Sequence, residues 1–182
     1  MQFIYLFWLL SEIIISRAFR ARSADRQGED KHSLAIIWIV IIAATTAAVY
    51  ISLNVAAPIS GTKSAVYMGL GLLILGILLR FFIIASLGKF FTTNVTIRQE
   101  HVLKTDGCYK YIRHPAYAAS LLSFAGFGIS LNNQIALLVV LIAVRLAFYN
   151  RIRIEERLLV KHFGQQYIDY GKHTWRLIPF IF

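Results

Sequence analysis

Long apolar runs alternate with short polar stretches along the chain, and this alternation predicts the secondary structure. Five apolar segments can be delimited, over residues 3–16, 33–57, 64–87, 116–131 and 134–149. The second and third each have about 25 residues, enough at about 1.5 Å per residue to cross about 30 Å of hydrocarbon with some tilt. The pattern predicts an all-α integral membrane protein with about five transmembrane helices.

Two of the connections between these segments read as tight turns. Residues 57–63, "APISGTK", contain Pro58 and Gly61, which favour a turn between antiparallel helices. Only Asn132 and Asn133 separate the last two segments, each of which has about 16 residues. We expect a helical hairpin whose two short helices are buried less against lipid and more against protein.

Two other features of the apolar segments have simple interpretations. The run "GLGLLILG" over residues 69–76 superficially resembles a nucleotide-binding loop, but no strand precedes it, so we expect close helix packing. Residues 3–16 lack a basic start and a small-residue cleavage site, which favours a retained anchor helix over a signal peptide. Within them, Glu12 has no obvious partner and is expected to reach the membrane interface.

Composition supports lipid as the solvent of this chain. Hydrophobic residues make up 58% of its 182 residues, and the mean hydropathy is +0.62. A soluble domain of this size needs polar residues on every helix, so that class is excluded. Cys108 is the one cysteine, which excludes an intrachain disulfide and a CxxC motif.

The basic residues predict how the chain is oriented. The net charge of +10 comes mainly from three polar stretches, over residues 17–32, 88–115 and 150–182. Five helices put all three stretches on one side and leave Lys63 on the other, so this side is predicted to be cytosolic. No basic stripe with interleaved aromatic residues supports nucleic-acid binding.

The stretch "YKYIRHPAY", over residues 109–117, is the first candidate for chemistry. Pro115 favours the first turn of a helix, and it biases His114 away from helical geometry. A helix start offers free N–H groups and a partial positive charge, so with Arg113 and His114 beside it the site suits a carboxylate or another anion. The alternative is that Arg113 merely reaches lipid headgroups.

Acidic residues beside the last apolar segment are the second candidate. On a helix that continues from this segment, Arg151 and Glu155 lie one turn apart on one face, and Glu156 follows. Acidic side chains next to a membrane span are costly unless they are paired or bind a ligand, so they are functional candidates. A purely structural ion pair between Arg151 and Glu155 is the alternative. Neither a metal-ligand spacing nor a GxSxG elbow is found.

Three motifs carry a resemblance to a known family. They are G-x-Y-x-x-x-R-H-P-x-Y over residues 107–117, E-E-x-x-L over residues 155–159 and F-G-x-x-Y over residues 163–167. Together they resemble the isoprenylcysteine carboxyl methyltransferase family, which is similar to membrane phospholipid methyltransferases. The resemblance covers about residues 87–179, roughly half of the chain.

The resemblance implies S-adenosylmethionine as the methyl donor, held on the cytosolic side rather than in a Rossmann domain. The positions that match the family's donor-binding residues are His101, Val102, Leu103, Lys104, Tyr109, His114, Pro115, Ala116, Tyr117 and Glu155. Arg151 matches a basic residue that faces the methyl acceptor. We expect Arg151, Glu155 and Arg113 to act in catalysis, with Arg176 also shaping the polar pocket.

The expected reaction is methyl transfer to a carboxylate or another group on a lipophilic or lipidated acceptor that enters from the membrane. A carboxylate is already ionised at neutral pH, so no general base is required. Residues 1–87 would form three spans, and residues 88–182 a catalytic region within one integrated domain. A prokaryotic plasma membrane location is expected. The alternatives are an NADPH-dependent membrane sterol or lipid reductase and a non-catalytic lipid-binding protein.

Overall fold

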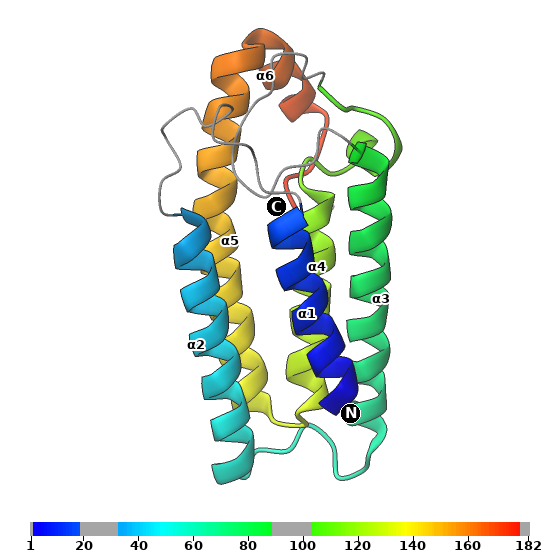
Figure 1. The fold of residues 1–182 in the computed structure, drawn as a ribbon, viewed down its shortest axis with the longest axis vertical. Coiled ribbons are helices and arrows are strands. Elements are labelled where there is room, and N and C mark those ends of the chain that lie inside the picture. Colours follow the sequence, from blue (N-terminus) through cyan, green and yellow to red (C-terminus); the bar gives the residue numbers. More distant parts are fainter. Residues whose placement is uncertain (1, 19–32, 89–102, 179–182) are drawn as a thin grey trace.

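The structure, a computed structural model, describes residues 2–18, 33–88 and 103–178, which fold into a helical bundle (Figure 1). The long helices of these ranges are α1 (Gln2–Ala18), α2 (Ser33–Asn54), α3 (Ser64–Leu87), α4 (Pro115–Ser130) and α5 (Gln134–Phe163). Two short helices, η3 (Gly107–Lys110) and α6 (Gln165–Lys172), lie at one end of the bundle. The helical fold predicted from the apolar segments is confirmed.

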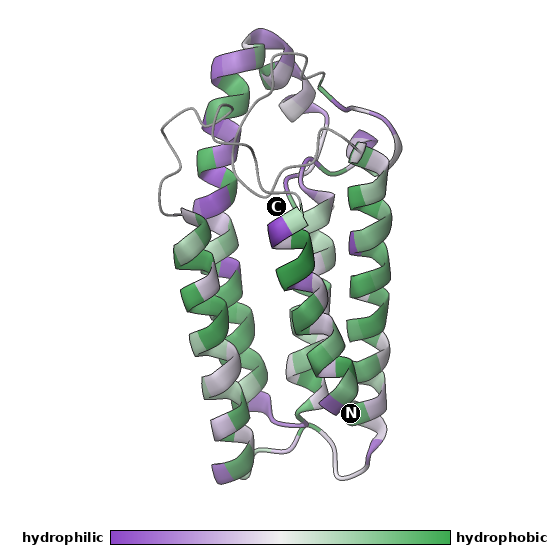
Figure 2. Ribbon diagram, viewed as in Figure 1, coloured by the Kyte–Doolittle hydropathy of each residue, from purple (hydrophilic) through white to green (hydrophobic). Residues whose placement is uncertain are grey.

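Successive long helices run in opposite directions, so alternate connections lie at opposite ends of the bundle (Figure 1). One of these ends is more hydrophilic than the rest of the bundle (Figure 2). One end is formed by the end of α3, the start of α4 and the polar last part of α5. Helices η3 and α6 lie at this end too, together with residues 173–178, which are called the C-terminal residues below. The connections over residues 55–63 and 131–133 form the other end. Within the described residues, the predicted polar stretches therefore meet at one end, opposite Lys63.

Three helices within the described ranges, α2, α3 and α5, are long and apolar enough to cross a membrane. The other two long helices are shorter, with 17 residues in α1 and 16 in α4. Large apolar side chains on the outer faces are exposed, among them Ile39, Phe82 and Leu146. Outward apolar faces of this extent are typical of a bundle surrounded by lipid. The chain is a helical membrane protein, and five spans remain a prediction.

Helix α5 joins the membrane part of the bundle to the polar end. It is one continuous helix of 30 residues, apolar in its first half and polar in its second (Figure 2). Its polar part extends past the start of α2 in Figure 1. The prediction that Arg151 and Glu155 lie on a continuation of the last apolar segment is thus confirmed.

Helices α3 and α4 approach until their backbones touch, because small residues face each other. A Cβ atom on Gly69 would lie 2.7 Å from the carbonyl oxygen of Gly126, and one on Gly76 would lie 2.6 Å from the amide nitrogen of Ser123. Small residues allow such close approach between membrane helices. The interpretation of residues 69–76 as a packing surface is confirmed.

The hairpin between α4 and α5 ends in two asparagines that bind the connection between α2 and α3. Asn132 adopts a positive φ of 50°, and its side chain donates to the carbonyl oxygen of Ser60 at 2.9 Å. Asn133 donates to the carbonyl oxygen of Val55 at 2.7 Å and accepts from the amide of Ala136 at 3.0 Å, which caps α5. The predicted tight hairpin is confirmed.

Replacing Asn133 by alanine is expected to lower the free energy of unfolding by about 1–3 kcal/mol, because a helix cap and a part-buried hydrogen bond are lost together. Thermal unfolding of the detergent-solubilised protein measures this change. Gln134→Ala is the matched control, since its contact with the Pro58 carbonyl is exposed. Equal effects of the two substitutions would show that Asn133 does not stabilise this end of the bundle.

Two charged residues face each other inside the apolar part of the bundle. The Nε atom of Arg80 on α3 lies 2.9 Å from a carboxylate oxygen of Glu12 on α1, and both side chains are mostly buried. This Nε–H has no hydrogen bond of good geometry among the described residues, so the contact is an ion pair without a well-aligned hydrogen bond. The prediction that Glu12 has no partner is wrong, while its place relative to the membrane interface stays a prediction.

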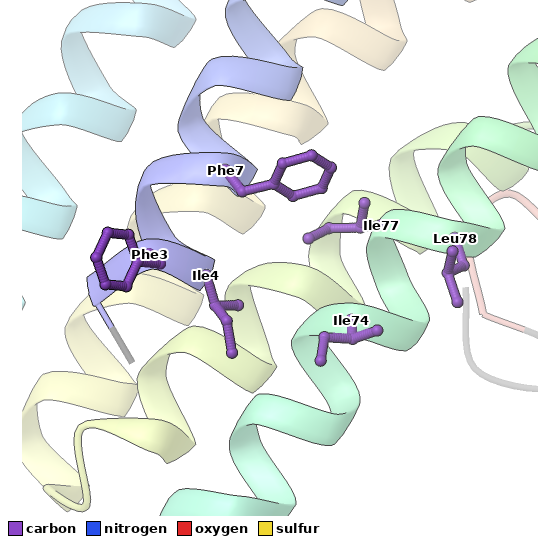
Figure 3. A pocket seen from close by; sticks show the side chains of 6 residues that line it. All are labelled: Phe3, Ile4, Phe7, Ile74, Ile77 and Leu78. Carbon is purple, nitrogen blue, oxygen red and sulfur yellow. The ribbon is translucent and has the colours of Figure 1, made fainter.

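An apolar groove of about 300 Å³ lies between α1 and α3 (Figure 3). It is lined by Phe3, Ile4, Phe7, Ile74, Ile77 and Leu78. Because none of these side chains is polar, the groove suits a hydrocarbon chain better than a charged ligand. A site for a charged ligand therefore has to be sought at the polar end of the bundle.

Candidate functional site

The candidate site forms where the chain enters α4. Gly107 turns the backbone at a φ of 58° into η3, and Pro115 is the first residue of α4. His114 precedes it with φ −123° and ψ 58°, outside helical geometry, as predicted from the following proline. This local structure buries the His114 ring between α4 and the polar part of α5.

Glu156 of α5 collects charged and polar groups from two other segments. Its carboxylate lies 3.2 Å from Nε of Arg113, 3.3 Å from Nε2 of His114 and 2.9 Å from Nη2 of Arg176. A second Arg176 nitrogen, Nε, donates at 3.0 Å, so the arginine binds both carboxylate oxygens. Glu156 therefore joins α5, the start of α4 and the C-terminal residues.

The C-terminal residues lie along the segment before α4 in a short parallel pairing. Arg113 N donates to the carbonyl oxygen of Trp175 at 2.8 Å, and His114 N donates to that of Arg176 at 3.1 Å. Trp175 N in turn donates to the carbonyl oxygen of Tyr111 at 2.9 Å. Backbone hydrogen bonds thus hold the chain after α6 against the segment that leads into α4.

Arg113 points into the protein, and its side chain is mostly buried. Besides Glu156, its guanidinium donates to the carbonyl oxygens of Gly171 at 2.6 Å and Thr174 at 2.5 Å. The alternative that Arg113 reaches lipid headgroups is wrong. These contacts make Arg113 a connector between α5, α6 and the start of α4.

Glu155 differs from its neighbour in its surroundings. Its side chain is 32% exposed, against 13% for Glu156. The Tyr117 hydroxyl donates to Glu155 at 3.0 Å, and Nδ1 of His114 lies 3.8 Å away. The Glu155 side chain is therefore the more open of the two, and it stands beside the first turn of α4.

The tyrosines of η3 and α6, at the same end of the bundle as the two carboxylates, stay neutral. Burial and the Glu155 charge raise the pKa of Tyr109, while burial and the charges of Glu156 and Glu155 raise that of Tyr167. Burial raises the pKa of Tyr170 to about 12, and its hydroxyl donates to the Tyr109 carbonyl oxygen at 2.6 Å. The buried Tyr167 hydroxyl has no hydrogen-bond partner among the described residues, so it is a donor that a polar ligand would satisfy.

Arg151 lies one turn before Glu155 on α5 and is almost completely buried. Its guanidinium donates to the hydroxyl of Ser33, the first residue of α2. Near Arg151, the ring of Tyr117 on α4 packs against the ring of Phe148 on α5, with 5.2 Å between the ring centroids. The predicted acceptor-side arginine is thus close to the start of α2.

The structure brings most of the predicted site residues together. His114, Tyr117 and Glu155 are in contact, and Tyr109 packs in a small cluster with Ala116 and Ala119 of α4. Leu103 and Lys104 precede η3, where Lys104 pairs with Asp106 at 3.0 Å. His101 and Val102 lie outside the described residues.

The sequence did not distinguish Glu156 as the centre of a charge cluster, and it missed Tyr167 and Tyr170. Both tyrosines belong to α6, where the motif F-G-x-x-Y places Tyr167 after the positive φ of Gly164. The motif was therefore a usable signal for one of them.

Comparison with known proteins assigns this arrangement to a family. A sequence model of the isoprenylcysteine carboxyl methyltransferase (ICMT) family matches residues 69–161, a little more than half of the 182-residue chain. The matched region includes the start of α4 and the two carboxylates of α5. The chain belongs to the ICMT family, which confirms the resemblance inferred from the motifs.

Curated relatives and a solved structure agree with this assignment. Protein-S-isoprenylcysteine O-methyltransferase B of Arabidopsis thaliana is 36% identical over 115 residues, covering 62% of this chain and 58% of the relative. The Tribolium castaneum protein-S-isoprenylcysteine O-methyltransferase is 38% identical over 116 residues, covering 63% and 41%. A structure of the eukaryotic intramembrane Ras methyltransferase ICMT superposes with a TM-score of 0.64 at 28% identity, covering 99% of this chain and 63% of that one. This chain spans about half the length of the curated relatives it matches.

Proposed function

We propose that this chain is an integral membrane methyltransferase that transfers the methyl group of S-adenosylmethionine to a carboxylate on a lipophilic acceptor. One observation carries the proposal: of two adjacent carboxylates, Glu156 is saturated by Arg113, His114 and Arg176, while Glu155 remains partly open. An open carboxylate at a membrane surface is suited to a cationic ligand. The names of the relatives support an isoprenylcysteine carboxylate as the acceptor group.

The residues present fit this donor. It has a cationic sulfonium and ammonium, which Glu155 would pair with, and a carboxylate. For that carboxylate, the start of α4 offers the N–H of Ala116, because Pro115 has none and those of Tyr117 and Ala118 bond to the His114 carbonyl oxygen. The buried Tyr167 hydroxyl is a further donor. Leu103 and Lys104 are proposed to line the same pocket.

For this reaction the protein has to align donor and acceptor and to exclude water, and no proton transfer is needed. When bound, S-adenosylmethionine supplies a methyl group that a carboxylate oxygen takes directly, while the C–S bonding pair returns to sulfur. Opposite charges are neutralised in this displacement, so a site with little water favours it. We assign Arg151 to orient the acceptor carboxylate, and Arg113 and Arg176 to hold the pocket in shape.

The five long helices are proposed to cross the membrane with the polar end, coloured as hydrophilic in Figure 2, in the cytosol, since the sequence puts the three basic stretches on one side of the membrane. Residues 88–182 would then bind the water-soluble donor. Residues 1–87 would help to form the acceptor side. The acceptor would enter from the membrane between helices, because its hydrocarbon part is more stable in lipid than in water.

Methyl transfer to a small S-prenylated cysteine with a free carboxylate tests the proposal. We expect a base-labile methyl ester to form from labelled S-adenosylmethionine with purified protein. The same compound supplied as its methyl ester is the matched control and should accept no label. Transfer to phosphatidylethanolamine instead would assign an amine acceptor, and no transfer to either compound would contradict a methyltransferase role for this chain.

Arg151→Gln is expected to raise the KM for the prenylated cysteine about tenfold, because a charged contact to the acceptor carboxylate is lost. The affinity for S-adenosylhomocysteine, the demethylated donor, should stay unchanged, which also shows that the variant folds. Steady-state kinetics and a binding titration measure the two quantities. An unchanged KM would remove Arg151 from the acceptor site.

A further inference from the structure

The ion pair between Glu12 and Arg80 lies away from the carboxylate cluster and takes no part in the proposed chemistry. Arg80 is seven residues before the end of α3 at Leu87, or about 10 Å along the helix axis. A charged pair at this depth in an apolar bundle costs solvation free energy. Such a pair is therefore a candidate for a specific role.

Arg80 reaches past Glu12 to the first turns of α4. Its Nη1 atom donates to the carbonyl oxygen of Ala116 at 3.0 Å and also to the hydroxyl of Ser120. The Ser120 hydroxyl donates to the same carbonyl oxygen at 3.1 Å. The guanidinium thus connects the carboxylate of α1 with the backbone and a side chain of α4.

The residues held in this way belong to the candidate site. Ala116 offers the N–H group proposed for the donor carboxylate, and the next residue, Tyr117, donates to Glu155. Below this level, Gly76 packs directly on Ser123 and fixes the distance between α3 and α4. Arg80 adds a polar contact one turn nearer the site, where the first turn of α4 meets α5.

We propose that Glu12 and Arg80 are positioning residues, which hold the first turn of α4 so that Ala116 and Tyr117 face the donor. The proposal rests on the proposed function. Glu12 neutralises and orients Arg80. The hydrogen bond from Arg80 to the Ala116 carbonyl oxygen then fixes the first turn of α4 relative to α1 and α3. Helix α1 thereby acts on a site that it does not itself line.

The double variant Glu12→Gln/Arg80→Gln tests this role without leaving an unpaired charge. We expect its affinity for S-adenosylhomocysteine to fall about tenfold, since hydrogen bonds that fix the first turn of α4 are lost. Hydrogen exchange in the ligand-free protein should become about tenfold faster in the peptide containing residues 116–120. Asn133→Ala is the control: it weakens the far end of the bundle and should leave both quantities unchanged well below its unfolding temperature.

Arg80→Lys separates positioning from charge. A lysine keeps the ion pair with Glu12, but it lacks the two separate nitrogens, Nε and Nη1, that the rigid guanidinium holds at fixed spacing on Glu12 and on Ala116. We expect nearly wild-type thermal stability together with fast exchange over residues 116–120. Wild-type exchange in both this variant and the double variant would overturn the proposal. If the wild-type protein itself does not bind S-adenosylhomocysteine, the proposed donor fails, and the exchange data still decide the positioning role.

Discussion

Replacing Glu156 by glutamine is expected to lower the free energy of unfolding by about 2–3 kcal/mol, because it removes the shared partner of mostly buried cationic groups. Arg113 and Arg176 would then face each other across a neutral amide, and the contact between α5 and the C-terminal residues would weaken. We also expect binding of S-adenosylhomocysteine to be lost. Thermal unfolding in detergent and a binding titration measure the two effects.

Asp169→Asn is the matched control for this substitution. It also changes a carboxylate to an amide near the C-terminus, but its ion pair with Lys172 is exposed on both sides. An exposed pair of this kind contributes little to stability, because water and salt screen the two charges. If Glu156→Gln were no more destabilising than Asp169→Asn, the cluster around Glu156 would not hold the C-terminal residues in place.

Gly126→Leu is expected to prevent α3 and α4 from packing and to cost about 3 kcal/mol or more. A Cβ atom at this position would lie 2.7 Å from the Gly69 carbonyl oxygen, which belongs to a rigid helix backbone and cannot move aside. Separating the helices would also draw Arg80 away from Ala116. Size-exclusion chromatography and thermal unfolding should show little monodisperse protein and an early transition.

Gly71→Leu is the control on α3, because no atom lies within 4 Å of a Cβ built on Gly71. It adds the same side chain on a helix of the same bundle but leaves the interface with α4 intact. We expect wild-type yield and stability. A Gly126→Leu variant that matched it would show that the close approach of α3 and α4 is not required for folding.

Much of the fold was predictable because its signals are local in the sequence. The lengths of the apolar segments predicted the helices, the pair Asn132 and Asn133 predicted the hairpin, and Pro115 predicted the start of α4. The small residues over 69–76 indicated close packing, and two of them, Gly69 and Gly76, lie seven residues apart on the helix face that meets α4. Each of these inferences needs only neighbours within a few turns.

The contacts that define the site were harder to predict because they join distant segments. Nothing in the spacing of the chain pairs Glu12 with Arg80, since the two residues lie on different helices. Likewise, Glu155 and Glu156 are adjacent in the sequence, and only the fold determines which of them Arg113 and Arg176 saturate. The predicted roles of His101 and Val102 lie outside the described residues.

Calorimetric titration of the purified protein with S-adenosylhomocysteine, beside the Glu155→Gln variant and beside NADPH, tests the proposed donor site most directly. We predict micromolar binding to the wild-type protein, weakened about tenfold or more in the variant because the carboxylate facing the cationic groups is lost. Folded Glu155→Gln protein that bound equally well would remove Glu155 from the site. Binding of NADPH alone would contradict the methyltransferase and indicate a reductase.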